Sequence, residues 1–158
     1  MDAAVWAEVE TLLTAEQMLL FRRMSRYDQR HSLNVLRSLR AAGHEQPDLL
    51  VAALLHDAAK SSGPLRLWHR VVIVLLEAFA PRSLAWLARK AAPGHWRYPF
   101  YAHRVHPEIG ARWAEEAGSS SLTVWLVANH QSSLEQARVL GEQKTSLLAA
   151  LRRADDDN

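Results

Sequence analysis

Apolar residues recur along this chain at the spacing of an α-helix. The clearest examples are Val5, Val9, Leu12 and Leu13, and then Leu33, Leu36 and Leu39. Alternation of apolar and polar residues with a period of two, which marks half-buried strands, is hard to find. The pattern therefore predicts an all-α fold, a compact bundle of helices.

Capping residues and glycines mark where the first helices begin and end. Thr14 followed by Gln17 forms a capping-box pattern that predicts the start of a second helix. Gly43 can adopt the left-handed conformation that ends many helices, so we expect the helix carrying His31 to end there. These signals mark a helix start at Thr14 and a helix end at Gly43.

The middle of the chain contains a strongly apolar segment from Leu49 to Lys60. Asp48, directly after a proline, is a plausible N-cap for it. We therefore predict a buried helix over these residues, with His56 and Asp57 late in it.

The rest of the chain also divides into predicted helices. They are a helix over 65–79, a shorter helix after Pro81, a helix from Pro107 to Ala117 that Gly118 ends, a helix capped by Ser121 that runs through His130, and a last helix over 143–154. The segment 93–101, with two prolines, a glycine and four aromatic residues, is predicted to be a loop. The assignment is weakest over 131–142.

Length and composition indicate one domain. The chain has 158 residues, of which 49% are apolar, and a domain of this size can bury most of its chain surface. No segment resembles a linker or an internal repeat, so we expect a single domain over 1–158. Because the sequence contains no cysteine, disulfides, thiolate metal sites and cysteine nucleophiles are excluded, and any metal must be held by nitrogen and oxygen.

The charge balance and the N-terminus exclude further classes. A net charge of +2 is far from a nucleic-acid-binding composition, so no nucleic-acid partner is expected. The N-terminus carries Asp2, Glu8 and Glu10 and lacks a basic segment followed by an apolar one, so it does not resemble a signal peptide. A cytoplasmic location is the expectation.

The longest apolar run extends from Val71 to Leu76 and ends at Glu77. It is much shorter than the roughly 20 residues that a membrane span needs, so no transmembrane segment is expected. Trp68, Arg66 and Arg70 beside the run leave a helix at a membrane surface as an alternative. We favour a buried core helix.

A histidine directly followed by an aspartate, His56-Asp57, lies in this apolar context. Ionised carboxylates are almost never buried without a partner, and a metal ion is the simplest partner for both side chains. Taken alone, the pair also fits a histidine at a helix end beside a solvated aspartate. His31 upstream and Asp155 downstream complete the order His, His-Asp, Asp and favour the metal site.

This arrangement resembles the HD superfamily of metal-dependent phosphohydrolases. The similarity rests on Ala-x-Leu-Leu-His-Asp-x-x-Lys over 52–60, on His31 before it and on the Ala-Asp pair that ends at Asp155. It covers roughly residues 20–155. The resemblance implies a helical bundle whose metal ligands converge from separate helices.

Two more histidines resemble the extra ligands of the two-metal branch of that superfamily. They are His106, in His-Pro-Glu-Ile-Gly-Ala, and His130, in Val-Ala-Asn-His-Gln. The resemblance implies that one metal is held by His31, His56, Asp57 and Asp155, and the other by His106, His130 and a bridging Asp57. The alternative roles are backbone capping for His106 and a helix-dipole contact for His130.

The remaining histidines have no place in this ligand pattern. His103 lies three residues from His106 and competes with it, although the Pro-x-x-Gly-Ala context favours His106. His44, His69, His95 and His103 are therefore expected to be surface or loop residues. Nitrogen and carboxylate ligands suit iron, manganese, zinc, nickel or cobalt and do not select among them. The resemblance to the two-metal branch implies two divalent transition metals, with iron or manganese first.

The resemblance implies an enzyme that hydrolyses a phosphoester or phosphoanhydride bond with water activated by two metals. Asp57, Lys60 and Glu108 are the candidate catalytic residues. Lys60 is also a candidate phosphate ligand, with a solvent-facing lysine as the equal alternative. Glu108 is a candidate acid, although an acidic residue in a first helical turn also fits dipole stabilisation.

A small phosphorylated molecule is the expected substrate. Arg97 and Arg104 flank the aromatic segment and are candidate phosphate ligands, while its aromatic rings offer a stacking surface for a base. Aromatic residues in a loop more often cover a core. A nucleotide is the first substrate to test, because short bacterial relatives that split symmetrical dinucleoside tetraphosphates share the six-ligand arrangement. A homodimer is compatible with the sequence.

Two rival functions remain open. Some proteins of the HD fold are di-iron oxygenases, and Tyr27 and Asp28 ahead of His31 could serve such a pocket; oxygen consumption distinguishes this class from a hydrolase. The other rival is a binding or regulatory module that has lost its metals, and the intact ligand set speaks against it.

Overall fold

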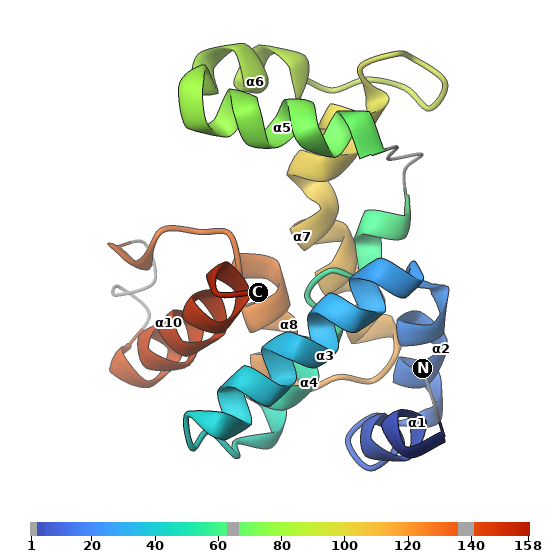
Figure 1. Cartoon of the computed structure of the whole chain (residues 1–158), viewed down its shortest axis with the longest axis vertical. Helices are drawn as coiled ribbons and strands as arrows, with labels where there is room; N and C mark the ends of the chain where they lie inside the picture. The colour runs from blue at the N-terminus through green and yellow to red at the C-terminus, as the bar shows by residue number, and fades with distance from the viewer. Residues whose placement is uncertain (1–2, 63–66, 136–140) are drawn as a thin grey trace. The chain divides into compact units, whose positions relative to one another are not determined.

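The computed structural model describes residues 3–62, 67–135 and 141–158. These residues form nine α-helices and one 3₁₀ helix, and no strand occurs among them, so the all-α prediction is confirmed (Figure 1). The chain separates into two compact units: unit 1 comprises Met1–Ala59 and Pro107–Asn158, and unit 2 comprises Lys60–His106. The single domain over 1–158 stays a prediction.

Unit 1 contains most of the helices. They are α1 (Ala3–Glu10), α2 (Ala15–Arg23), α3 (Arg26–Ala41), α4 (Pro47–Leu55), α8 (Ser121–Asn129), α10 (Glu142–Asp156) and the C-terminal part of α7 (Tyr98–Glu116). The segment 136–140, part of the region where the sequence pattern is weakest, lies outside the described residues.

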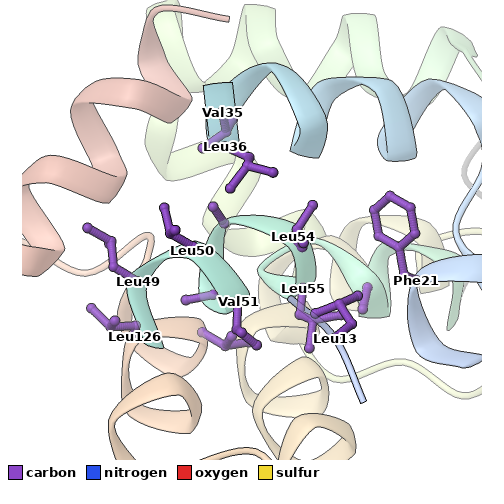
Figure 2. Packing of buried hydrophobic residues seen from close by; sticks show 14 of the residues in the cluster. Leu13, Phe21, Val35, Leu36, Leu49, Leu50, Val51, Leu54, Leu55 and Leu126 are labelled. Atoms are coloured by element: carbon purple, nitrogen blue, oxygen red, sulfur yellow. The ribbon is translucent and has the colours of Figure 1, made fainter. Parts of the chain in front are cut away.

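Helix α4 lies at the centre of the unit 1 core. Its seven residues from Leu49 to Leu55 are all buried. Figure 2 shows Leu36 of α3 and Leu126 of α8 on opposite sides of it. Because burying one leucine side chain contributes about 2 kcal/mol, these contacts fix the position of α4 firmly, and with it the residues that follow Leu55.

The helix starts agree with the sequence in part. Thr14 and Gln17 form the predicted capping box at the start of α2. The prediction that Asp48 caps the next helix is wrong, because α4 begins at Pro47 and the side chain of Gln46 accepts the amide of Leu49 at 2.7 Å. Proline is well suited to a first helical position, so the helix starts one residue before Asp48.

Helix α8 also begins one residue earlier than predicted. Ser120, not Ser121, is its N-cap, and its hydroxyl accepts the amide of Thr123 at 3.0 Å. Both serines have the chemistry of a cap, so the sequence alone did not distinguish them.

The prediction of one helix through Lys60 is wrong. Helix α4 ends at Leu55, His56 and Asp57 form a turn, and a 3₁₀ helix follows over Ala58–Ser62. The ring Nδ1 of His56 lies 3.0 Å from the carbonyl of Ala53, which the amide of residue 57 would bind in a continuing α-helix. The histidine side chain thus satisfies a carbonyl at the helix end.

Helix α7 begins well before the predicted start. It extends from Tyr98 with Pro107 in its interior, so the predictions of a loop through residue 101 and of a helix starting at the proline are wrong. Phe100 and Ala102 are buried, and their packing holds the segment as a helix despite the aromatic and proline content. Its predicted end is confirmed, because Gly118 follows with a φ of 75°.

Unit 2 is built from α5 (Leu67–Phe79), α6 (Pro81–Leu87) and the N-terminal part of α7. Ile73, Ala88 and Phe100 form its buried cluster. The prediction of a buried core helix over the apolar run is wrong for one face of α5, since Val71 and Leu75 are about half exposed. No helix of the described residues is long and apolar enough to cross a membrane, as the sequence predicted.

Candidate metal centre

Three of the candidate ligand histidines share one local geometry. In His56, His106 and His130 the ring Nδ1 lies 3.0, 2.5 and 2.8 Å from the backbone carbonyl three residues earlier. Such a bond to a carbonyl requires the proton on Nδ1 and orients the ring, so the other nitrogen, Nε2, is the one suited to a metal.

His106 shows why the ring takes this role. In a regular α-helix the carbonyl of His103 would accept the amide of residue 107, but residue 107 is proline and has none. The His106 ring supplies the missing donor to that carbonyl. Pro107 therefore leaves the carbonyl of His103 without its usual backbone donor. The hydrogen bond from the His106 ring to this carbonyl then fixes the orientation of the ring.

His31, His56 and Asp155 form a first group of potential ligands in unit 1, with their ligand atoms within 4.8 Å of one another. The Oδ1 atom of Asp155 lies 2.8 Å from Nε2 of His31 and 3.4 Å from Nε2 of His56. Ligand atoms about 2.1 Å from one ion lie roughly 3 to 3.4 Å apart in octahedral or tetrahedral geometry. The separations fit a single metal ion.

Asp57 lies between several histidines. Its Oδ2 is 3.5 Å from Nε2 of His56 and 3.9 Å from Nε2 of His31, whereas its Oδ1 is 3.8 Å from Nε2 of His130. The two oxygens of one carboxylate thus face different histidine groups. This is the arrangement that a bridging carboxylate requires.

Asp57, His106 and His130 form a second group of potential ligands, and all three are buried. His106 is the last residue of unit 2 and is followed in the same helix by Pro107 of unit 1. The described residues therefore contain two triads of histidine and aspartate that can hold metal ions.

The chemistry of the donors fits metal ions better than a plain polar core. His56, Asp57, His106 and His130 are each at most 3% exposed. A carboxylate this deeply buried is stable only beside positive charge or several donors, and the histidine nitrogens that face it become cationic only by taking up protons. Divalent cations supply the required charge while the histidines stay neutral.

The electrostatics around Asp155 already favour its ionised form. Burial raises the pKa of its carboxyl, but hydrogen bonds from His31 and His56 outweigh that effect and hold the pKa well below its usual range. Asp155 is thus a carboxylate at neutral pH, as a metal ligand must be. It lies in the last turn of α10, not after the helix as the sequence predicted.

Two further features help to position the site. A Cβ atom built on Gly110 would lie 3.4 Å from Val127 Cγ1 and 3.8 Å from the carbonyl oxygen of His56. Glycine therefore lets this part of α7 lie close against α8 and the turn after α4. Arg152 donates to the carbonyl of Ser132 at 2.5 Å and ties α10 to the segment after His130.

The other predicted site residues belong to neither triad. Glu108 is exposed on α7, and Lys60 lies half-buried in the 3₁₀ helix. Arg97 donates to the carbonyl of Trp86 at 3.4 Å and its guanidinium lies 5.3 Å from that ring, while Arg104 is exposed on α7. Their roles toward a substrate stay predictions.

The histidines left out of the ligand set differ in environment. His44 is half-buried near the end of α3, and His95 is exposed. The expectation of a surface position is wrong for His69, which is only 6% exposed. Its ring stacks on Trp68, with the ring centroids 3.6 Å apart, and makes a T-shaped contact with Phe100. The Nε2 atom of His103 lies 3.3 Å from Oε1 of Glu77. Burial, and to a smaller extent the charge of the nearby His106, lower the pKa of His103.

Comparisons with protein-family models, with curated proteins and with solved structures found no match to the chain. The class of the molecule therefore rests on its fold and its side chains. In its described residues it is an all-α protein with two groups of histidine and aspartate suited to metal ions, one fully buried and one partly buried.

Proposed function

We propose that this protein is a metal-dependent phosphohydrolase of the HD type with two divalent transition metals. The observation that carries the proposal is the position of Asp57, whose two oxygens face His56 and His31 on one side and His130 on the other. A carboxylate shared in this way is the central element of a two-metal site.

The proposed ligand assignment follows the two triads. His31, His56 and Asp155 bind the first metal together with Asp57, and His106 and His130 bind the second with the same aspartate. The Nδ1 contacts of His56, His106 and His130 to backbone carbonyls support the assignment, because they present Nε2 as the ligand atom. Iron and manganese are proposed first because of the resemblance to two-metal HD proteins, and the nitrogen and oxygen donors are equally compatible with zinc, nickel and cobalt.

Two divalent ions, when bound, activate water and offset the charge of the phosphate oxygens during hydrolysis of a phosphoester or phosphoanhydride. The chain's own residues hold and orient the site. Asp57 is proposed to be essential through ligation, Lys60 to bind a phosphate oxygen, and Glu108, which is exposed, to act as the acid of the reaction.

The proposed substrate is a small phosphorylated molecule, with nucleotides tested first. Arg97 and Arg104 are the proposed further phosphate contacts, because guanidinium groups match phosphate in two-point hydrogen bonding. The aromatic side chains of the 96–101 segment are the proposed stacking surface for a base.

A di-iron oxygenase gains no support from the residues that the sequence offered for it. Tyr27 is 70% exposed, which is unlike a pocket residue. Asp28 accepts the hydroxyl of Ser25 at 2.6 Å, and its amide donates back to that hydroxyl, so it stabilises the start of α3.

A phosphoester panel assayed without oxygen tests the proposal. We expect the manganese-loaded protein to release phosphate or nucleoside monophosphate from at least one nucleotide or aryl phosphate, and Asp57→Asn to reduce that rate at least about 1000-fold through loss of the metals. Glu45→Gln, a change on the surface of unit 1, is the matched control and should keep the rate. Metal-loaded protein that is inactive on the whole panel but consumes oxygen would contradict the proposal.

A further inference from the structure

Helix α5 presents a row of apolar side chains to solvent. The row consists of Trp68, Val71, Leu75 and Phe79, which are 53, 51, 52 and 82% exposed. Their spacing of i, i+3, i+7 and i+11 places them on one face of the helix over about 16 Å. Single exposed apolar residues are common, but a continuous row of this kind marks an interaction surface.

The row is not the core-facing side of α5. Ile73, on another face of the helix, is 3% exposed and packs with Ala88 and Phe100. His69 is also buried and contacts Phe100. The helix therefore has one apolar face in the unit 2 core and a second apolar face in water.

More exposed tryptophans lie in the same unit. Trp86 on α6 and Trp96 in the segment before α7 are 52 and 60% exposed. The guanidinium of Arg97 lies 5.3 Å from the Trp86 ring centroid. Tryptophan beside cations is enriched where a protein meets the interfacial region of a bilayer, since its ring is apolar and its N–H is polar.

Charge is distributed unevenly between the two units. Residues 60–106 contain eight Lys and Arg residues and one acidic residue, Glu77, which gives unit 2 a net charge of +7. Because the whole chain carries +2, the rest of the chain carries −5. The exposed cations include Arg82 in α6 and Arg89 and Lys90 after it. Unit 2 is thus strongly basic and also exposes an apolar helix face.

We propose that unit 2 binds the surface of an anionic lipid bilayer through the exposed row of α5. Aliphatic and aromatic side chains would enter the interfacial layer, and the surrounding cations would meet the lipid phosphates. No described helix is long and apolar enough to cross the bilayer, so the contact is peripheral.

Charge and side-chain type favour this occupant over two others. A second copy docked through the same face would bring two units of charge +7 together, which opposes association. A nucleic acid would neutralise the cations, but its phosphate backbone offers nothing that would bury the aliphatic Val71 and Leu75. A bilayer satisfies both the charge and the apolar row.

Vesicle flotation of the full chain tests this proposal. We expect binding to phosphatidylcholine vesicles that contain about 30% phosphatidylglycerol and little binding to pure phosphatidylcholine. Raising the ionic strength to 1 M, where the Debye length falls to about 3 Å, should weaken the binding at least tenfold. Absence of binding to the anionic vesicles at low salt would overturn the proposal.

Two pairs of variants separate the apolar and the electrostatic contributions. The double variant Leu75→Ser with Phe79→Ser should lower the partition coefficient between vesicles and water at least tenfold. The control Leu19→Ser, at a side chain of unit 1 that is 59% exposed, should leave this coefficient unaltered. Circular dichroism confirms that the variants fold. Equal binding of wild type and the double variant would contradict the role of the row.

The charge-reversal variant keeps the test decisive if the serine variant does not fold. Arg82→Glu, Arg89→Glu and Lys90→Glu together should lower binding to anionic vesicles about 100-fold, because each cation contributes roughly fivefold near such a surface. The same three changes at the exposed Arg23, Arg26 and Arg112 of unit 1 are the control and should have little effect. A dimer or a nucleic-acid complex that forms without vesicle binding would overturn the proposal.

Discussion

At the scale of single residues, the same side-chain contact recurs at three candidate ligands. In each, a histidine ring binds the carbonyl that the following residue's amide would bind in a continuing helix. His56 and His130 do so at the C-caps of α4 and α8, and His106 does so within α7, before Pro107. The position of each ring thus follows from the backbone on which it sits.

Pro107→Ala tests this link between backbone and ligand. The new amide can bind the carbonyl of His103 and compete with the His106 ring, so we expect metal affinity to fall about tenfold. The helix itself should gain stability, by up to about 3 kcal/mol in the free energy of unfolding, because an interior proline is removed. Urea unfolding of the metal-free protein and chelator competition measure the two effects.

Pro81→Ala is the control for that variant. Pro81 occupies the first turn of α6, where the amide has no helical acceptor, so both stability and metal affinity should change little. A Pro107→Ala protein with wild-type metal affinity would show that the proline does not help to orient His106.

The candidate ligands were predictable from residue order, whereas their local structure was not. The His, His-Asp, Asp order pointed to His31, His56, Asp57 and Asp155 before any coordinates. It could not show that α4 stops at Leu55, because Ala58 and Ala59 are good helix formers. The contact of the His56 ring with the carbonyl of Ala53, three residues earlier, is a local side-chain effect that helix propensity does not describe.

At the scale of elements, hydrogen bonds join the starts of α4 and α8. The carboxylate of Asp48 accepts the hydroxyls of Ser120 and Thr123, the latter at 3.1 Å, and the side-chain amide of Gln46 at 2.9 Å. Burial raises the pKa of Asp48, but these hydrogen bonds outweigh it and hold the pKa below its ordinary 3.8. The ionised form therefore favours the folded state.

Asp48→Asn should reduce stability in a pH-dependent way. A pKa lowered by folding contributes stability above the unfolded value, near pH 4, and that contribution is lost as the pH falls further. At pH 7 we expect a loss below about 1 kcal/mol, because the partly exposed carboxylate is screened by solvent. Urea unfolding at pH 7 and pH 3 checks this, and an equal loss at both pH values would contradict it.

Gly110 sets how closely α7 approaches α8. Alanine adds a Cβ at 3.4 Å from Val127 and raises helix propensity, so Gly110→Ala should change stability by less than about 1 kcal/mol. Gly110→Val adds two methyl groups at this close contact and should cost about 1 to 3 kcal/mol. Thermal unfolding distinguishes the two, and equal stabilities would show that the approach is not tight.

At the scale of the whole molecule, the proposed ligands in unit 1 come from four separate helices or the turns that follow them. His31 lies in α3, His56 and Asp57 follow α4, His130 follows α8 and Asp155 lies in α10. Bound metals would therefore connect elements that are distant in sequence. Their removal should affect the stability of the unit and not only one loop.

Chelation should lower the melting temperature. A ligand at 100 times its Kd stabilises the folded state by about 2.7 kcal/mol, which for a domain near 150 residues corresponds to at least about 5 °C. Scanning calorimetry with and without chelator measures the shift. The Asp57→Asn protein should show no such shift, and an equal shift in both proteins would contradict metal binding at this site.

The helical class and the order of the helices were predictable because apolar periodicity is strong in the described elements. The exposed row on α5 was not, since periodicity cannot tell a buried apolar run from one that faces water on one side. The uneven distribution of charge is present in the sequence, but it could be recognised only after the structure divided the chain into two units, with unit 2 spanning residues 60–106.

Elemental analysis of metals in the protein purified without a histidine tag tests the two-metal centre most directly. We predict about two transition-metal ions per chain in the wild type, about one when His106 and His130 are replaced by alanine, and almost none in Asp57→Ala. Metal-free protein after expression in metal-replete medium, or an Asp57→Ala protein that keeps both ions, would contradict the account.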